Sequence, residues 1–359
     1  MSRRSAPSMK LKIYFRPLPV VVMLVVVACL FWVASATMAS GRWLMVFAVF
    51  YTVLSILSLW SLGRIARLER PRKWGKPERL LILAPHEDDC VIAAGGIGVR
   101  NGRLGGATRV VYLAPDETPG LAGIRAAEAR AAWAYAGVPE SEIHHIPLLP
   151  PLRRRDPAML HEAVGTLRAI IREYGPTTII APMFEGGHIH HDMLAALLGL
   201  VVAPDDKFEV FEAPEYSPYV SVNNTPHRTI ALCARWLFGL VSYYGPPDGI
   251  DGRPIELIEL ALEELDIKRR MLGCFASQNA PSLVATRGYP DRLVRMKFDR
   301  DWHQPFVFAR SYLRLALATQ RALPRALASR LFPGATGTIG RNDTITDWPR
   351  EWSLPDHKE

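Results

Sequence analysis

The distribution of hydrophobic residues divides the chain into two regions. Residues 18–39 and residues 43–62 contain no charged side chain, and each stretch is about as long as the roughly 20 apolar residues that a membrane-spanning helix requires. Only Ser40, Gly41 and Arg42 separate the two stretches. This pattern predicts an N-terminal transmembrane helical hairpin over residues 18–63.

Beyond residue 79, short apolar runs alternate with longer amphipathic stretches. Such alternation is typical of a parallel sheet with helices on both faces. We therefore expect an α/β fold, a Rossmann-like three-layer α/β/α sandwich with a mostly parallel sheet. The expected strands cover residues 80–84, 109–114, 143–148, 177–181 and 208–213, and the expected helices cover residues 93–103, 123–136, 157–174, 191–202 and 254–272.

Pattern and composition together predict the order of segments along the chain. Residues 214–254 are rich in Pro, Gly, Asn and aromatic residues, which is typical of a long substrate loop or lid. Residues 309–332 alternate arginines with Leu and Ala, and both a core-packing helix and a membrane-surface helix fit this stretch. The predicted segments are a basic N-terminus (1–17), the hairpin (18–63), a basic linker (64–79), a catalytic domain (80–310) and an amphipathic C-terminal segment with a tail (311–359).

The net charge of +8 is concentrated partly beside the predicted hairpin. Basic flanks lie on the cytoplasmic side of a membrane, so we expect a two-pass protein whose catalytic domain faces the cytoplasm. These residues are also expected to contact anionic lipid headgroups. A cleaved signal peptide is the alternative, because Ala34-Ser35-Ala36 resembles a cleavage site. The basic residues are Arg3, Arg4, Lys10, Lys12 and Arg16 before the hairpin, and Arg64, Arg67, Arg70, Arg72, Lys73 and Lys76 after it.

The remaining composition narrows the classes of partner. Basic and aromatic residues are not interleaved in the way that follows a nucleic-acid backbone, so we expect no nucleic acid, and the sequence indicates no protein partner. The four cysteines, Cys29, Cys90, Cys233 and Cys274, show no paired spacing. This is typical of a reducing compartment and predicts no disulfide framework.

Histidines and carboxylates follow two of the expected strands directly. The apolar run 80–84 stops at Pro85, and the β-branched run 177–181 stops at Pro182. Parallel strands end at one edge of a sheet, which is where ligands bind in open α/β folds. The polar residues expected to meet at that edge are His86, Asp88 and Asp89 from the first loop and His188, His190, His191 and Asp192 from the second.

The two clusters together offer the ligands of a catalytic metal. His86, Asp89 and His191 supply two imidazoles and a carboxylate, a common zinc set that leaves a fourth position for water. Such a metal lowers the pKa of its bound water to about 7. Asp88, beside a ligand without being one, is placed as general base, and His188 as the acid that protonates a leaving amine or as an oxyanion stabiliser. This division of labour fits hydrolysis of an amide.

Each cluster alone has an ordinary explanation. An acidic loop is often only a solvated turn, and a single histidine is more often structural than a ligand. The pairing of the two clusters is what indicates function. His190 and Asp192 are as compatible with a supporting role through hydrogen bonds to the ligands, or with no role, as with a catalytic role.

The same residues resemble the PIG-L family of zinc-dependent N-deacetylases, also called LmbE-like. The family motif Pro/Ala-His-Pro-Asp-Asp-Glu stands at residues 85–90 as Pro-His-Glu-Asp-Asp-Cys, and Gly-His-Pro-Asp-His stands at residues 187–191 as Gly-His-Ile-His-His. The resemblance implies removal of acetyl from an N-acetylglucosamine unit or a related acylated amine. It also implies the roles given above: His86, Asp89 and His191 as ligands, Asp88 as base, and His188 as acid or oxyanion stabiliser.

Weaker matches extend the resemblance to about residues 78–280. The segment from Arg125 to Glu128 looks like the family's Arg-x-x-Glu, which implies that Arg125 contacts substrate. Lys268 with Ser277-Gln278 looks like the family's later Lys and Ser-Gln positions.

The two motifs depart from the family pattern without losing a ligand. Glu87 replaces the usual Pro, Cys90 the usual Glu, and His190 the Asp that in relatives can tune the neighbouring histidine. These departures therefore leave the pKa of His188 and the shape of the pocket mouth undetermined by the resemblance. Asp192 is a candidate to replace the missing Asp as the carboxylate partner of the histidine. Zn²⁺ is the expected metal, with Fe²⁺ as the alternative.

The expected function is a membrane-anchored, cytoplasm-facing N-deacetylase, because tethering raises the local concentration of a lipid-linked amino sugar. The expected partners are membrane lipids and an amino-sugar or glycolipid substrate. One alternative is a glycosyltransferase in which Glu87, Asp88 and Asp89 hold a metal-bound nucleotide diphosphate, which leaves the histidines unexplained. The other is a non-catalytic sugar-lipid binding protein, which has no need of Asp88 beside a metal.

Overall fold

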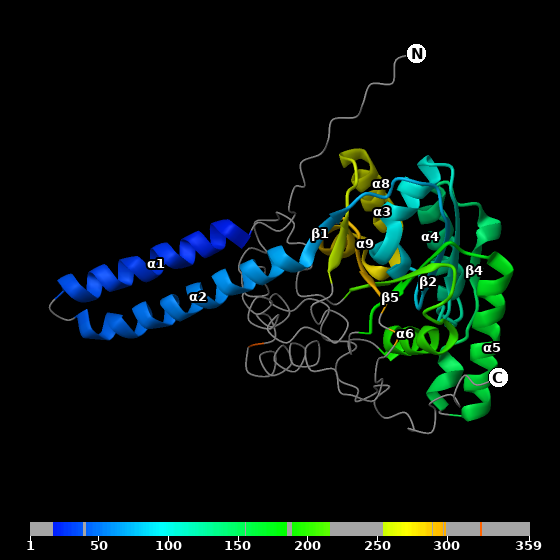
Figure 1. The fold of residues 1–359 in the computed structure, drawn as a ribbon, viewed down its shortest axis with the longest axis horizontal. Coiled ribbons are helices and arrows are strands. Elements are labelled where there is room, and N and C mark those ends of the chain that lie inside the picture. The colour runs from blue at the N-terminus through cyan, green and yellow to red at the C-terminus, as the bar shows by residue number, and fades with distance from the viewer. Residues whose placement is uncertain are drawn as a thin grey trace, which may run out of the picture.

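The computed structural model describes residues 17–38, 41–154, 156–184, 189–215, 254–288 and 290–296, together with residues 298 and 324. Two long helices project from an α/β body (Figure 1). Nearly all of the basic N-terminus (1–17), of the expected substrate loop (214–254) and of the C-terminal segment (311–359) lies outside the described residues.

A mixed eight-stranded sheet forms the centre of the body. Its strands are β1 Glu69–Arg72, β2 Arg79–Ala84, β3 Ala107–Tyr112, β4 Ile143–His145, β5 Thr178–Pro182, β6 Glu209–Ala213, β7 Ile255–Ile258 and β8 Arg292–Arg295. They are arranged in the order β1-β7-β8-β6-β5-β2-β3-β4. All neighbours are parallel except the pairs of β8 with β6 and with β7. The expected mostly parallel sheet is therefore present, with one reversed strand.

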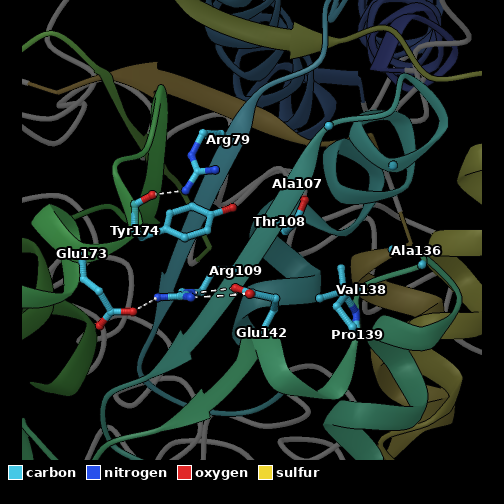
Figure 2. Close-up of a pocket in the computed structure, with 13 residues that line it drawn as sticks. Arg79, Ala107, Thr108, Arg109, Ala136, Val138, Pro139, Glu142, Glu173 and Tyr174 are labelled. Carbon is cyan, nitrogen blue, oxygen red and sulfur yellow. Dashed lines mark hydrogen bonds and ion pairs between the residues drawn. The ribbon is translucent and has the colours of Figure 1, made fainter.

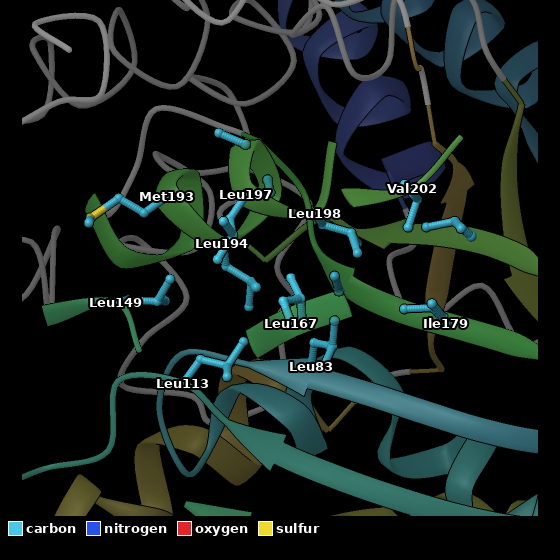
Figure 3. Close-up of a cluster of buried hydrophobic side chains, with 14 of the residues drawn as sticks. Leu83, Leu113, Leu149, Leu167, Ile179, Met193, Leu194, Leu197, Leu198 and Val202 are labelled. Carbon is cyan, nitrogen blue, oxygen red and sulfur yellow. The ribbon is translucent and has the colours of Figure 1, made fainter. Parts of the chain in front are cut away.

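Helices cover both faces of this sheet. They are α3 Asp89–Arg103, α4 Leu121–Ala134, α5 Pro157–Tyr174, α6 Ile189–Val201, α8 Leu262–Gly273 and α9 Ala280–Arg287. Successive strand residues point to opposite faces, so Leu81 and Leu83 of β2 join residues of α5 and α6 in one buried cluster (Figure 3). Leu80 and Ile82 join residues of α3, α4 and α8 on the other face.

Helix α5 has boundaries that its local sequence determines. Asp156 precedes the helix and accepts a hydrogen bond from the backbone N–H of Ala158 at 2.9 Å, and Pro157 occupies the first turn, where its missing N–H is not needed. Gly175 ends the helix with a left-handed φ of 60°, which glycine adopts without strain. The observed span, Pro157–Tyr174, is the predicted one.

Cys90, one of the departures from the family motif, is part of the core between α3 and α4. Its Sγ lies 2.8 Å from the Tyr112 hydroxyl and 3.2 Å from the indole N–H of Trp133. Burial raises the pKa of the Cys90 thiol, so this cysteine is an unreactive packing residue. The close approach depends on Gly98, because a Cβ there would lie 2.5 Å from the Trp133 ring.

The predicted helix over residues 254–272 is wrong in its first part. Residues Ile255–Ile258 form β7, and α8 begins only at Leu262. Within the sheet, Ile255 pairs with Glu69 of β1 and with Val294 of β8. The apolar positions of this segment fit both helical and strand spacing. The segment forms a strand because it pairs with β1 and β8, which are distant in the sequence.

The segment expected to be a basic linker, residues 64–79, is partly regular structure. Helix α2 (Leu44–Leu68) runs directly into β1 at the sheet edge, and the edge position tolerates Pro71. The guanidinium of Arg72 forms ion pairs with Glu256 and, at 3.1 Å, with Glu209. These ion pairs therefore hold β1, which continues directly from α2, against the rest of the sheet.

Helices α1 (Pro17–Thr37) and α2 pack side by side as a hairpin (Figure 1). Phe31 of α1 stacks on Tyr51 of α2 with 5.5 Å between ring centroids, while many large apolar side chains of both helices are exposed. Within the described residues, Gly41–Trp60 is the one helical stretch long and apolar enough to cross a membrane, and Val21–Thr37 is a shorter apolar helix. Two crossings of a membrane thus stay a prediction.

Candidate metal centre

Three neighbouring parallel strands bring the candidate residues to one edge of the sheet. These strands are β2, β5 and β6. His86 follows β2, His191 lies in the first turn of α6 after β5, and Glu215 follows β6. Because parallel strands end at the same edge, side chains from three distant segments meet there.

His86, Asp89 and His191 lie together, with one ligand atom of each within 4.8 Å of the others. Oδ2 of Asp89 lies 2.9 Å from Nδ1 of His86 and 3.1 Å from Nε2 of His191. The same oxygen accepts the backbone N–H of His86 at 3.0 Å. Asp89 and His191 are buried and His86 is partly exposed, so solvent reaches the cluster at His86.

These three donors suit a divalent metal ion. Two atoms bound to one zinc ion at tetrahedral angles lie about 3.4 Å apart, slightly more than the separations from Asp89 to the two histidines. Burial raises the pKa of Asp89, but the charges and hydrogen bonds of His191 and His86 hold it well below its usual value. The carboxylate is therefore ionised, as a metal ligand must be. The donor types and the charge fit Zn²⁺ and Fe²⁺.

Glu215 lies beside the other ring nitrogen of His191. Its Oε2 lies 3.5 Å from Nδ1 of His191, and its side chain is buried. A carboxylate behind a ligating histidine fixes the orientation of the ring and raises its basicity. Sequence analysis missed this residue, although Glu215 follows the expected strand 208–213 at the same sheet edge as the two motifs.

Replacing Glu215 with glutamine is expected to weaken metal binding by about 10–100-fold, because a neutral amide holds the imidazole N–H less strongly than a carboxylate does. Calorimetric titration of the metal-free full chain with Zn²⁺ measures the affinity. Asp205→Asn removes an exposed carboxylate before the same strand and should bind as tightly as wild type. Equal affinities in all three proteins would contradict the role of Glu215.

His190 contacts the cluster without joining it. Its Nδ1 lies 3.0 Å from Nε2 of His86. Burial and the neighbouring charge of His86 lower the pKa of His190 to about 3, so the ring is neutral and orients His86 by a hydrogen bond. Asp192 is buried in the first turn of α6. His188, for which Asp192 was the candidate partner, lies outside the described residues.

Asp88 occupies the N-cap position of α3, directly before the candidate ligand Asp89. Its half-buried side chain makes no capping hydrogen bond. Burial lowers the pKa of His86, but the hydrogen bond and charge of Asp89, followed by the charge of Asp88, raise it above its usual value. A carboxylate beside the ligands and outside their set is what the general-base assignment requires.

Arg125 lies at the same sheet edge between two carboxylates. Its Nη1 is 3.1 Å from Oδ2 of Asp116 and 3.9 Å from Oε2 of Glu87. Asp116 belongs to the loop after β3 and Glu87 to the loop after β2. Arg125, on α4, therefore joins two loops beside the metal cluster.

The other residues of the resemblance hold helices together. Glu128 of α4 accepts hydrogen bonds from the backbone N–H and the hydroxyl of Ser277, at 2.8 Å and 2.6 Å. Lys268 of α8 is fully buried and donates to the carbonyl of Ile92 at 2.9 Å and to Asp291 at 2.5 Å. These contacts support the fold around the site.

A cavity of about 310 Å³ lies away from the metal cluster. Its lining includes Arg79 and Ala107, the first residues of β2 and β3, so it lies at the amino ends of these strands. The metal cluster lies at the opposite edge of the sheet, after the carboxyl ends of β2 and β5. Figure 2 shows Arg109 held between Glu142 and Glu173 in this cavity. The cavity is therefore not part of the metal centre.

Comparison with known proteins gives one family match. Residues 81–201 match the model of the PIG-L family, described as GlcNAc-PI de-N-acetylase. No curated protein matches the chain.

Solved structures overlay on the chain with low similarity. A triple mutant of a deacetylase in the teicoplanin biosynthetic pathway is 17% identical, with a TM-score of 0.44, over 62% of this chain and 100% of that chain. GalB, the 4-carboxy-2-hydroxymuconate hydratase from Pseudomonas putida KT2440, is 15% identical, with a TM-score of 0.36, over 69% of this chain and 89% of that chain. The N,N'-diacetylchitobiose deacetylase from Pyrococcus horikoshii is 18% identical, with a TM-score of 0.33, over 61% of this chain and 84% of that chain. Overlays with TM-scores this low carry no argument about the reaction.

Proposed function

Because residues 81–201 are a PIG-L family domain, we propose that the protein is a metal-dependent hydrolase that removes an N-acetyl or other N-acyl group from an amino sugar. One observation carries the proposal: His86, Asp89 and His191 come from two distant segments of that domain, one after β2 and one after β5, and place their ligand atoms within 4.8 Å of one another. Metal-assisted amide hydrolysis uses such a ligand set with a base beside it.

The chain's own residues divide the work of the reaction. A divalent metal held by His86, Asp89 and His191 would activate water and polarise the amide carbonyl. Asp88 takes the proton of the attacking water, since it lies beside the ligands and outside their set. His188 delivers a proton to the leaving amine, a role supported by its place in the second motif. Glu215 keeps the ring of His191 in its ligating orientation.

The helical hairpin supports a substrate at a membrane surface. Gly41–Trp60 is long and apolar enough to cross a membrane, and basic residues follow α2 along the chain. We infer that the protein is anchored with its catalytic domain on the cytoplasmic face, where basic residues favour anionic lipids. A lipid-linked amino sugar in the same membrane would then be held at high local concentration.

The test is release of acetate by the purified full chain in detergent. Two substrates are compared, a membrane lipid extract and soluble methyl N-acetylglucosaminide, each with and without a chelator. We expect release that stops on chelation and returns when Zn²⁺ or Fe²⁺ is added. Release that persists after metal removal would contradict the metal-dependent mechanism. No release from either substrate by the metal-loaded protein would overturn the deacetylase assignment.

A further inference from the structure

Glu87 stands where the family motif has proline, and its side chain is turned into the protein. It is 1% exposed. Its Oε1 accepts the backbone N–H of Asp116 at 3.3 Å, whereas Oε2 accepts no hydrogen bond and faces Nη1 of Arg125 at 3.9 Å. Burying a carboxylate is costly unless a nearby cation compensates its charge. The guanidinium of Arg125 is that cation.

Arg125 is in turn compensated by two carboxylates. Oδ2 of Asp116 lies 3.1 Å from Nη1 of Arg125, and Oε2 of Glu87 lies 3.9 Å from the same nitrogen. Two carboxylates against one guanidinium leave this group with an excess negative charge. A free arginine is a strong binder of phosphate or carboxylate groups, but an anion approaching this arginine meets repulsion from both neighbours, which partial burial strengthens.

The group also borders the metal cluster. Glu87 directly follows the ligand His86, and Asp116 follows β3, the parallel neighbour of β2, at the same edge of the sheet. A substrate whose amide reaches the cluster therefore places its neighbouring groups close to Arg125.

We propose that Glu87 determines which substrate charge the site accepts. Together with Asp116 it outweighs the positive charge of Arg125, so the site takes a neutral, hydroxyl-rich group beside the amide and rejects an anionic one. Hydroxyl groups suit this arrangement because they donate to carboxylates and accept from arginine N–H groups. The inference rests on the proposed function and narrows its substrate class to acylated amino sugars without phosphate or carboxylate next to the amide.

The test compares two substrates with the metal-loaded full chain: neutral methyl N-acetylglucosaminide, and N-acetylglucosamine 1-phosphate, whose charged group is on the carbon next to the one that bears the amide. Wild type should show the higher kcat/KM with the neutral sugar. Glu87→Gln removes the charge and keeps the shape, so it should shift the ratio of kcat/KM values by about tenfold or more towards the phosphorylated sugar, mainly through KM. Calorimetric binding of both sugars measures the same preference without turnover.

Two further variants make the result decisive. Asp116→Asn should shift the preference in the same direction, and it tests the proposal if Glu87→Gln does not fold. Glu117→Gln removes a charge from an exposed side chain of the same loop and should leave the preference unchanged. An unshifted preference in the first two variants, or an equal shift in Glu117→Gln, would overturn the role of Glu87. If wild type releases no acetate, the proposed function fails, and the binding preference still decides the charge inference.

Discussion

Asp88→Asn is expected to lower kcat for amide hydrolysis by about 10²–10⁴-fold. The substitution removes the group that accepts the proton of the attacking water while keeping nearly the same size. Asp88 is outside the cluster of His86, Asp89 and His191, so the variant should still bind one metal ion per chain. Its side chain makes no capping hydrogen bond, and asparagine is as good an N-cap residue as aspartate. The fold of α3 should therefore survive the change.

The measurement is steady-state acetate release together with the metal content of each protein. Asp205→Asn, at an exposed position, makes the same chemical change and should retain wild-type kcat. A metal-loaded Asp88→Asn protein with full activity would show that another group is the base. Loss of activity together with loss of metal would show that Asp88 is a ligand instead.

Lys268→Met is expected to lower the free energy of unfolding by about 3–5 kcal/mol, because removing one partner of a buried ion pair leaves an uncompensated charge. Lys268 and Asp291 have fully buried side chains, and Nζ lies 2.5 Å from Oδ1. Asp291 also accepts the backbone N–H of Ile97 in α3 at 2.5 Å. The pair therefore ties α8 to α3, the helix that begins at Asp89 of the candidate metal centre.

Urea denaturation of the full chain in detergent measures this loss. The double variant Lys268→Met with Asp291→Asn removes both charges and should recover part of the lost stability, which separates the charge effect from lost packing. Lys207→Met, at an exposed position, should change stability by less than about 0.5 kcal/mol. A single Lys268→Met variant as stable as wild type would contradict the role of the pair.

The central elements of the fold could be predicted from the sequence because they are locally determined. Strand β2 is a continuous apolar run that stops at a proline, and α5 has an N-cap aspartate, a proline in its first turn and a glycine after its last. The meeting of His86, Asp89 and His191 could be predicted for the same reason, since strand ends and their loops were visible. The rule that parallel strands end at one edge supplied the rest.

What the sequence could not determine depends on contacts between distant segments. Strand β1 consists of Glu69-Arg70-Pro71-Arg72, which no strand propensity favours, and it is a strand because β7 pairs with it. The contact of Glu87 with Arg125 depends on how two loops and a helix pack. Glu215 was missed although its position after a strand was visible, because no motif marked it.

The direct passage from α2 into β1 has a consequence for the order of folding. Strand β1 leaves the ribosome immediately after the hairpin, but its partner β7 is synthesised only after β2 to β6. Pairings between such distant segments form slowly, and an open strand edge invites pairing with other chains. The hairpin and β1 are therefore complete before β1 can find its partner strand. Translation that stops before residue 255 would leave β1 unpaired, with an aggregation-prone edge.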